Sequence, residues 1–412
     1  GGVVWQHGAE IAAWGEPARA DQTFSVAKTY LCLLAGVAQH QGRLPDVDRP
    51  VVAQLPGIGF DSAHNAPITW RHLLTQVSEW EGHCLGLSDQ ADRWRKVGQD
   101  PRPAAGPKGG ARPLQPAGSY WEYNDVRINQ LSLALLHLFR EPLETVFRRE
   151  ILQPLGAQDR FAWEPYDEAW VSIDGRRLPS VPGGTHWGGG VSISARDQAR
   201  VGQLLLGDGV HQGRRLLPEA WVWQMAEPVA IAPFYGWLVW LNREGQAFPG
   251  ASTRAMFMQG AGGHLVWVDP ELDAVVVTRW LDPAHTAAFT ARMAKALRAG
   301  QCVISDAYAV VDKKESLAWL YNLQIPEWNR GNQIEAHEPK RKRALLLHKL
   351  EIKRLRESLQ EEGLTLVPLS VYFKRGWAKV ELGVCKGKKL HDKRAAIKEK
   401  DAKREIARRV KR

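Results

Sequence analysis

The sequence predicts two modules of different fold class: an α+β domain with an antiparallel sheet and a helical region, then a small β-barrel with a basic tail. Charged residues divide the chain near residue 300. Residues 301–412 contain 27 Lys and Arg against 15 Asp and Glu, a net charge of +12, whereas the first 300 residues contain 28 against 30, a net charge of −2. Of the 18 tryptophans, 15 also precede residue 301. Because a basic segment attracts phosphate, we expect a nucleic-acid partner for the second module.

Bulk properties exclude several classes of protein. The 412 residues, 44% of them hydrophobic, suffice for two or three domains. No run of eighteen apolar residues occurs, so no membrane span is expected. The chain begins at Gly1 without a charged and apolar leader, so we expect any signal peptide to be absent or removed. The cysteines lack metal-ligand spacing, so no disulfide framework, metal site or other cofactor is predicted: Cys32, Cys84, Cys302 and Cys385.

Strands are expected at both ends of the first module, with helices between them, so that the last strands complete the sheet. Alternating apolar and polar residues over 3–14 predict two short strands joined by a turn. Apolar residues at three- and four-residue spacing from Tyr30 to Val37 predict a buried helix that stops at Gly42. Further helices are expected over 68–74, 126–139, 196–206 and 289–297, and further strands over 235–242, 256–258, 265–269 and 274–280.

Ser25 and Lys28 form a Ser-x-x-Lys pair at the start of this helix. Three residues apart, the two side chains share one helix face, and the helix N-terminus favours negative charge beside the hydroxyl. A serine hydroxyl becomes a good nucleophile when a neighbouring base takes its proton. A lysine serves as that base only when burial or nearby cations keep it neutral. Because this spacing also arises by chance, an ordinary helix start with a solvated lysine is the alternative.

Three later segments strengthen the prediction of a hydrolase site. Residues 123–125, Tyr-Asn-Asp, place a phenol and short polar groups ahead of a helix. Glycines 188–190 allow close backbone approach. Residues 259–264, Gln-Gly-Ala-Gly-Gly-His, lie between two strands, where a glycine-rich edge can direct N–H groups at an oxyanion. The Pro- and Gly-rich residues 97–118 predict a long loop, which in a compact domain often flanks a site.

In this order, the segments resemble the serine β-lactamase and penicillin-binding-protein superfamily over roughly residues 3–298. The resemblance is strongest to the class C-like serine hydrolases, which include esterases and 6-aminohexanoate-dimer hydrolases. It implies Ser25 as the acylated nucleophile, and Lys28 and Tyr123 as the shared general base and acid. It also implies that Asp125 replaces the asparagine of the usual Tyr-x-Asn motif, and that the backbone N–H groups of Ser25 and Gly263 form the oxyanion hole. The implied supporting residues are His186, Gly189, Gly260, Gly262 and His264.

The third motif departs from the superfamily. It normally reads Lys-Thr-Gly or His-x-Gly, whereas residues 260–262 read Gly-Ala-Gly. The cation that grips the carboxylate of a β-lactam or peptide is missing there, so we expect a small ester or amide substrate rather than a β-lactam. Taken singly, Tyr123 also fits a packed core tyrosine, His186 and His264 fit structural histidines, and the glycines fit turns.

The second module is expected to contain short strands around one helix, which suits a barrel of oligonucleotide-binding type over residues 299–385. Strands are predicted over 304–311, 319–325, 363–373 and 377–384, with a helix from residue 338 to about 360. Residues 386–412 are charged and lack a wide apolar face, which predicts a basic tail. A merely solvated tail is the alternative.

Two segments of this module, 342–348 (KRALLLH) and 387–394 (GKKLHDKR), resemble the SmpB family of bacterial trans-translation, and the resemblance covers about 298–412. The family's N-terminal segment has no counterpart here, so we expect a barrel that is open on one side. The resemblance implies tmRNA (SsrA RNA) and stalled ribosomes as partners, and a cytoplasmic location. The expected RNA contacts are Arg341, Lys342, Arg343, Lys386, Lys388, Lys389, Lys393 and Arg394.

The sequence leaves three interpretations open. One is an acyl-transfer enzyme, and another is an RNA-binding ribosome-rescue factor. The third is a chimeric gene product in which the hydrolase acts alone and the truncated second module binds RNA non-specifically. The missing segment favours the third interpretation, as does the junction at 293–300, which lacks a Pro-, Ser- or Gly-rich spacer. Hydrolases of this type are often exported, whereas trans-translation takes place on cytosolic ribosomes.

Overall fold

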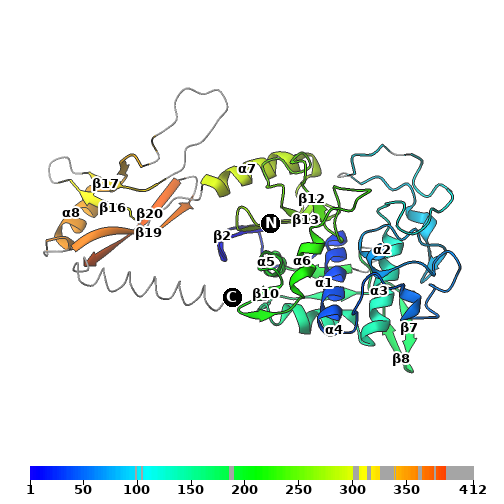
Figure 1. Ribbon diagram of the computed structural model, residues 1–412. Helices are drawn as coiled ribbons and strands as arrows, with labels where there is room; N and C mark the ends of the chain where they lie inside the picture. Colours follow the sequence, from blue (N-terminus) through cyan, green and yellow to red (C-terminus); the bar gives the residue numbers. More distant parts are fainter. Residues whose placement is uncertain are drawn as a thin grey trace, which may run out of the picture. The chain divides into compact units, whose positions relative to one another are not determined.

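The computed structural model describes residues 1–97, 100–103, 105–184, 190–299, 306–312, 317–324, 338, 340–360, 364–374 and 377–386, without the side chains of 299, 372–374, 377 and 378. The chain forms two compact units, Gly1–Leu297 and Arg298–Arg412 (Figure 1). Within the described residues, no helix is both long and apolar enough to cross a membrane.

A six-stranded antiparallel sheet organises the first unit. Its order is β12-β13-β14-β15-β1-β2, so the first strand of the chain pairs with a late one, with Val4 opposite Val276. The expected completion of the sheet by the last strands is thereby confirmed. The strands are β1 (Gly2–Gln6), β2 (Ala9–Trp14), β12 (Trp240–Leu241), β13 (Met256–Gly260), β14 (His264–Asp269) and β15 (Ala274–Thr278).

Smaller sheets and seven α-helices complete the described part of this unit. The three-stranded sheet has the order β3 (Asp21–Gln22), β9 (Gly190–Ile193) and β6 (Ala162–Glu164). The two-stranded ribbons are β4 (His83–Cys84) with β5 (Leu87–Ser88), β7 (Trp170–Ile173) with β8 (Arg176–Pro179), and β10 (Val210–His211) with β11 (Arg214–Arg215). The α-helices are α1 (Ala27–His40), α2 (Trp70–Leu74), α3 (Asp125–Phe139), α4 (Leu143–Phe147), α5 (Ala195–Leu206), α6 (Glu219–Met225) and α7 (Thr286–Ala299).

Both faces of the sheet are covered, because every residue of β14 and β15 is buried although successive side chains point to opposite faces. Helix α5 packs on β14 and β15, and Gly202 permits the close approach, since a Cβ there would lie 2.5 Å from Val275 Cγ1. The rings of Trp14 and Phe289, 6.4 Å apart, join β2 to α7.

Local sequence signals explain where three helices begin. The Thr69 hydroxyl accepts from the His72 N–H at the start of α2, and the Ser194 hydroxyl accepts from the Asp197 N–H at the start of α5. The Asn124 side chain accepts from the N–H of Val126 at the start of α3. Helices α1 and α3 pack side by side (Figure 1). Their N-terminal ends bring residues 25–28 and 123–125 together.

The predicted strand over 235–242 is wrong for most of its length, because only Trp240–Leu241 pairs with β13. The residues before it form turns, with isolated bridges between Tyr235 and Trp240 and between Val229 and Ala232. Leu238 has a φ of 54°, a left-handed conformation that an extended strand does not contain.

The second unit contains a five-stranded antiparallel sheet in the order β18-β17-β16-β19-β20, with one helix, α8. Its core contains Ala309, Leu320 and Leu366, with Leu355 of α8 packed against them. In the described residues β18 and β20 are the edge strands, and closure into a barrel stays a prediction. The elements are β16 (Tyr308–Val311), β17 (Ala318–Tyr321), β18 (Arg343–Leu345), α8 (Lys349–Ser358), β19 (Leu364–Lys374) and β20 (Trp377–Lys386).

The prediction that a helix starts at residue 338 is also wrong. Arg343–Leu345 is instead strand β18, which pairs with β17 through Ala344 and Trp319. Helix α8 begins only at Lys349, where the Glu351 carboxylate accepts from the backbone N–H of His348 at 2.7 Å. Pairing with a distant strand therefore overrides local helical preference at 343–345.

A buried ion network joins α3 to the loops around the site. The Arg127 side chain is fully buried and donates to Asp89 at 2.7 Å, to Glu79 at 2.9 Å and to Glu122 at 3.0 Å. Arg112 binds Glu79 and Glu122, and Arg93 binds Asp89. Burial by itself raises the pKa of Glu79, but the hydrogen bond from Arg112 and the charge of Arg127 hold that pKa below its usual value. Three arginines thus balance three carboxylates.

Replacing Arg127 by Met should lower the free energy of unfolding by about 3 to 5 kcal/mol, because the substitution leaves buried carboxylates without their central partner. Urea denaturation of the full chain measures this loss. The control is Arg149→Met, since Arg149 is about half exposed in its ion pairs with Glu141 and Glu150 and should cost at most about 1 kcal/mol. Equal losses in the two variants would show that the network does not hold the unit together.

Candidate active site

Ser25 and Lys28 are in direct contact at the start of α1. Ser25 lies in a short 3-10 helix, Phe24–Val26, that leads into α1. Lys28 Nζ donates to Ser25 Oγ at 2.8 Å and to the carbonyl oxygen of Gly183 at 3.0 Å. Lys28 is 1% exposed, so it is not the solvated lysine of an ordinary helix start. Phe24 has a φ of 53°, a strained conformation for a non-glycine residue that is typical of functional sites.

Asp125, the first residue of α3, faces Lys28. One of its carboxylate oxygens lies 2.5 Å from Lys28 Nζ, and the other accepts from Arg95 Nη1 at 2.6 Å. The Asp125 backbone N–H donates to the carboxylate of Asp92 at 2.9 Å, and Arg95 lies 3.3 Å from the same carboxylate. The exposed Lys108 also pairs with Asp92, at 3.1 Å. A chain of alternating charges therefore runs from Ser25 to the surface.

Arg95, Asp92 and Lys108 were not predicted at the site from the sequence. All three come from the loop region that precedes Tyr123, and no motif or spacing marks them. The Pro- and Gly-rich composition of 97–118 was the only available signal, and it pointed to a loop near the site without identifying a residue in it.

The Lys28–Asp125 ion pair changes the role that Lys28 can take at Ser25. The sequence predicted a neutral lysine as the base, whereas Lys28 Nζ forms an ion pair with the Asp125 carboxylate 2.5 Å away. An ammonium donates a hydrogen bond to Ser25 and leaves the serine proton for another acceptor. The arrangement can therefore hold and polarise Ser25 through Lys28, with a second group as the base.

Tyr123 is packed in the core and also lies against two cations of the candidate site. Its ring stacks on Trp240, with centroids 5.4 Å apart, and is buried. Lys28 Nζ lies 4.8 Å from the ring centroid, and the Arg95 guanidinium lies 5.4 Å from it. Each cation is attracted to the electron-rich face of the ring, so Tyr123 lies beside the charged groups of the candidate site. The packed-tyrosine interpretation and the acid–base interpretation are therefore compatible.

The glycines of the β13–β14 turn lie in different surroundings. A Cβ on Gly260 would lie 2.2 Å from the carbonyl oxygen of Thr23, so this glycine brings β13 against the segment that leads to Ser25. Gly262 and Gly263 each have a φ of 73° and lie against Trp280 and Leu281. The described contacts thus bring Gly260 nearer to the Ser25 segment than Gly263. The oxyanion assignment of Gly263 stays a prediction.

His264 is buried between aromatic rings beside the site. Its ring centroid lies 4.7 Å from that of Trp280 and 5.5 Å from that of Phe24. Among the described residues, neither ring nitrogen has a hydrogen-bond partner. Burial, reinforced by the charge of Arg279, lowers the pKa of His264 to about 4. His186 and Gly189, also expected at the site, lie outside the described residues.

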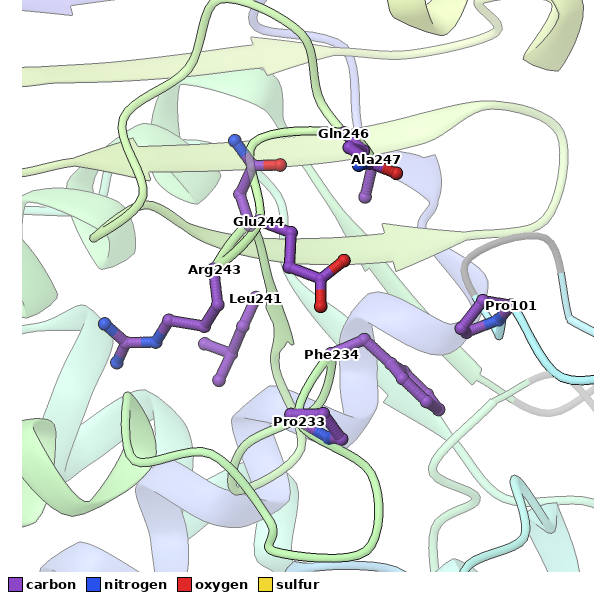
Figure 2. Close-up of a pocket in the computed structure, with 9 residues that line it drawn as sticks. Pro101, Pro233, Phe234, Leu241, Arg243, Glu244, Gln246 and Ala247 are labelled. Carbon is purple, nitrogen blue, oxygen red and sulfur yellow. The ribbon is translucent and has the colours of Figure 1, made fainter.

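Two cavities adjoin this region. One of about 270 Å³ is lined by Tyr123, Arg95, Trp121 and Arg102 among others. The second, of about 320 Å³, is shown in Figure 2, where the carboxylate of Glu244 is directed toward the space between Leu241, Phe234 and Pro101. The Arg102 guanidinium lies over both Trp121, at 4.8 Å, and Phe234, at 5.7 Å. Trp121 lines the first cavity and Phe234 lines the second.

The sheet, the helices and the buried Ser-x-x-Lys pair define the first unit as having the fold of a serine hydrolase of the β-lactamase type. The β-lactamase family model matches residues 2–295, and the SmpB protein family model matches residues 290–412. The chain therefore belongs to the β-lactamase family through its first unit and to the SmpB family of SsrA-binding proteins through its second.

Individual relatives agree with both assignments. The SsrA-binding protein of Synechococcus sp. (strain JA-2-3B'a(2-13)) is 48% identical over 117 residues, which are 28% of this chain and 75% of that protein. The protein of the same name from Saccharopolyspora erythraea is 54% identical over 114 residues, 28% of this chain and 70% of that protein. A putative 6-aminohexanoate-dimer hydrolase from Bacillus anthracis has a TM-score of 0.51 and 18% identity, covering 72% of this chain and 79% of that chain. This last likeness shows the fold of the first unit.

Protonation of His264 should destabilise the fold in mild acid. Its folded-state pKa of about 4 lies below the ordinary value near 6.5, so the unfolded chain binds this proton first. The stability that depends on neutral His264 is full above about pH 6.5 and falls by up to about 1.4 kcal/mol per pH unit as the pH drops toward 4. Urea unfolding at pH 7.5 and pH 5 should show a smaller loss for His264→Gln than for the unsubstituted chain.

His285→Gln is the control, because the His285 side chain is 72% exposed. This substitution should leave the pH dependence as it is in the unsubstituted chain. If His264→Gln and the unsubstituted chain lost the same stability between the two pH values, His264 would not be held neutral by burial.

Proposed function

We propose that the first unit is a serine acyl hydrolase that cleaves a small ester or amide through a covalent intermediate on Ser25. The 2.8 Å contact between buried Lys28 Nζ and Ser25 Oγ is the observation that carries this proposal. It holds the hydroxyl in one orientation at the end of α1, where the helix dipole favours negative charge. Asp125 and Gly183 hold the ammonium in turn, so the serine is positioned before any substrate binds.

In the proposed reaction, Ser25 Oγ attacks the substrate carbonyl carbon and its proton passes to the oxygen of Tyr123, which begins the step as the phenolate. The leaving alcohol or amine receives that proton as its bond to the acyl carbon breaks. Water then attacks the acyl-enzyme with Tyr123 again as the base, which releases the acid and restores Ser25. Lys28 and Arg95, both at the Tyr123 ring, supply the positive charge that stabilises the phenolate before it takes the serine proton and after it passes that proton on.

The proposed substrate class follows from the oxyanion region. The backbone N–H of Ser25 and one from the 260–263 turn are the proposed donors to the oxyanion. Gly260 takes the place of the cation that binds a β-lactam carboxylate, and it lies tightly against the Thr23 carbonyl. A neutral ester or amide therefore suits the site better than a β-lactam.

Ser25→Ala should abolish both labelling by a fluorophosphonate and hydrolysis of p-nitrophenyl butyrate, because no other serine contacts Lys28 in the described residues. The unfolding midpoint should change little. Intact mass spectrometry and absorbance measure the two effects. Ser172→Ala, on an exposed position of β7, should leave both unaffected.

Tyr123→Phe distinguishes a role of Tyr123 as the base from a role in core packing. The substitution keeps the ring stacked on Trp240 and removes only the hydroxyl. Turnover should fall by about a hundredfold or more if the phenol moves the proton. Persistent labelling of Ser25→Ala, or unchanged turnover by Tyr123→Phe, would refute the assigned roles.

We propose further that the second unit binds tmRNA (SsrA RNA) and, through it, acts on stalled ribosomes in the cytoplasm. Sequence identity of about half to SsrA-binding proteins, over most of their length, supports this proposal. In it, β16–β20 belong to a barrel of oligonucleotide-binding type, and Arg341, Lys342 and Arg343 contact phosphates before and within β18. Lys386 ends β20, whereas Lys388, Lys389, Lys393 and Arg394 of the expected tail lie outside the described residues.

The alternative is that the hydrolase acts alone and the second unit binds RNA only through its charge. The net charge of +12 over residues 301–412, from 27 Lys and Arg against 15 Asp and Glu, favours binding to any phosphate backbone. Phosphate contacts position a protein on RNA but do not identify the RNA.

Filter binding of tmRNA and an unrelated tRNA decides between these alternatives. Specific recognition predicts that the chain binds tmRNA at least about tenfold more tightly at physiological salt, and that the ratio persists as salt rises. Charge reversal at Lys388, Lys389, Lys393 and Arg394 should weaken binding of both RNAs. It should also reduce the salt dependence, in which the log of the affinity falls by about 0.7 to 0.9 per phosphate contact for each log unit of salt concentration. Equal affinities for the two RNAs would leave only charge-driven binding.

A further inference from the structure

One face of the second unit's sheet presents aromatic side chains on adjacent strands. Tyr308 of β16 lies opposite Tyr321 of β17, and Val310 lies opposite Trp319. Residues directly opposite each other in an antiparallel pair point to the same face. The Tyr308 and Tyr321 rings are stacked, with centroids 5.3 Å apart and planes 12° from parallel. Tyr308 is 40% exposed and Val310 is 43% exposed.

The core of the unit lies on the other face of the same strands. Ala309 and Leu320, the alternate residues of β16 and β17, are buried with Leu366, and α8 packs on that side. The aromatic residues are therefore not needed to complete the core that the described residues form. Large apolar side chains left at a surface in this way mark a binding site.

Basic residues border the aromatic face. Lys342 Nζ lies 4.5 Å from the centroid of the Trp319 ring. Lys342 directly precedes β18, whose Ala344 lies opposite Trp319. Arg341 and Arg343 flank Lys342 in the sequence, within a module whose net charge is +12 from 27 Lys and Arg against 15 Asp and Glu. The partner should therefore offer both negative charge and flat apolar rings.

We propose that Tyr308, Trp319 and Tyr321 form a platform on which the bases of single-stranded RNA stack, with Lys342 at the adjacent phosphate. Every base has a π-face, so such a platform binds single strands with little dependence on sequence. A duplex cannot use it, because duplex bases are already stacked on each other. The platform rests on the proposed RNA binding of the second unit, and adds to it a contact that requires unpaired bases.

The test uses the full chain with two fluorescein-labelled probes, a ten-nucleotide oligouridylate and an RNA duplex of equal length. Trp319→Leu and Tyr308→Leu should each weaken binding of the oligouridylate by about fivefold or more. The duplex affinity and the slope of affinity against salt should be unchanged, because no charge is removed. Trp319→Phe and Tyr308→Phe should retain most of the affinity, which separates lost stacking from a disturbed sheet.

The matched control is Trp170→Leu in the first unit. The Trp170 ring is 42% exposed and also has a cation against it, since the Arg177 guanidinium lies 5.3 Å away. This variant should bind both probes like the unsubstituted chain. Lys342→Ala should reduce the salt slope for both probes, as expected of a phosphate contact.

Each result decides the platform. Unchanged oligouridylate binding by the leucine variants would overturn it while leaving the proposed RNA binding intact. Equal weakening of single strand and duplex would also overturn it, because the rings would then act through the fold or through charge. Equal affinities for tmRNA and tRNA would refute specific tmRNA recognition. If the leucine variants still weakened oligouridylate binding in that case, the platform would be supported. Failure of the unsubstituted chain to bind the oligouridylate would overturn the platform, whereas tmRNA binding is decided separately by the filter-binding comparison.

Discussion

The first unit depends on the ion pair between Lys28 and Asp125, which joins the N-terminal ends of α1 and α3 beneath Ser25. Each charge is neutralised by the next: Asp125 by Arg95, Arg95 by Asp92, and Asp92 by exposed Lys108. Charges taken out of water are tolerated only when partners replace the lost hydration. Each charged side chain in this series therefore has a partner of opposite charge, from Lys28 beside Ser25 to Lys108 at the surface. The loop that supplies Arg95 and Lys108 is therefore part of the site.

A carboxylate in the place of the superfamily's usual asparagine changes what the lysine can do. Paired with Asp125, Lys28 Nζ donates to Ser25 Oγ at 2.8 Å, and in the proposed reaction it is Tyr123 that takes the serine proton. The Arg127 network supports the same segment from the other side, because it binds Glu122, the residue just before Tyr123. Tyr123 is thus preceded in the sequence by Glu122, which binds Arg127, and followed two residues later by Asp125, which binds Lys28 and Arg95. These ion pairs hold the backbone on both sides of the phenol.

The two units solve the problem of burial differently. Both faces of the large sheet in the first unit are covered, and its site lies where two helices begin. The small sheet of the second unit buries one face against α8 and leaves aromatic side chains on the other. A covered sheet suits a rigid catalytic site, whereas a half-covered basic sheet suits contact with a large, charged partner. The two proposed ligands, a small ester or amide and an RNA, therefore belong to sheets that differ in how much of their surface is covered.

The sequence by itself determined the change of charge between two modules, the Ser25–Lys28 spacing and, to within one residue, the starts of α3 and α5. Charge composition, three-residue spacing and apolar periodicity are local properties. Only the tertiary structure decided the partners of that pair. Arg95 lies 30 residues before Asp125, and no local pattern links them. The close packing of Gly260 on Thr23 likewise follows from the fold. Residues 343–345 form a strand because β17 supplies backbone hydrogen-bond partners for them, in place of the partners that a helix would supply within the segment. Long-range pairing of this kind depends on where the chain returns in space, which the order of residues alone does not state.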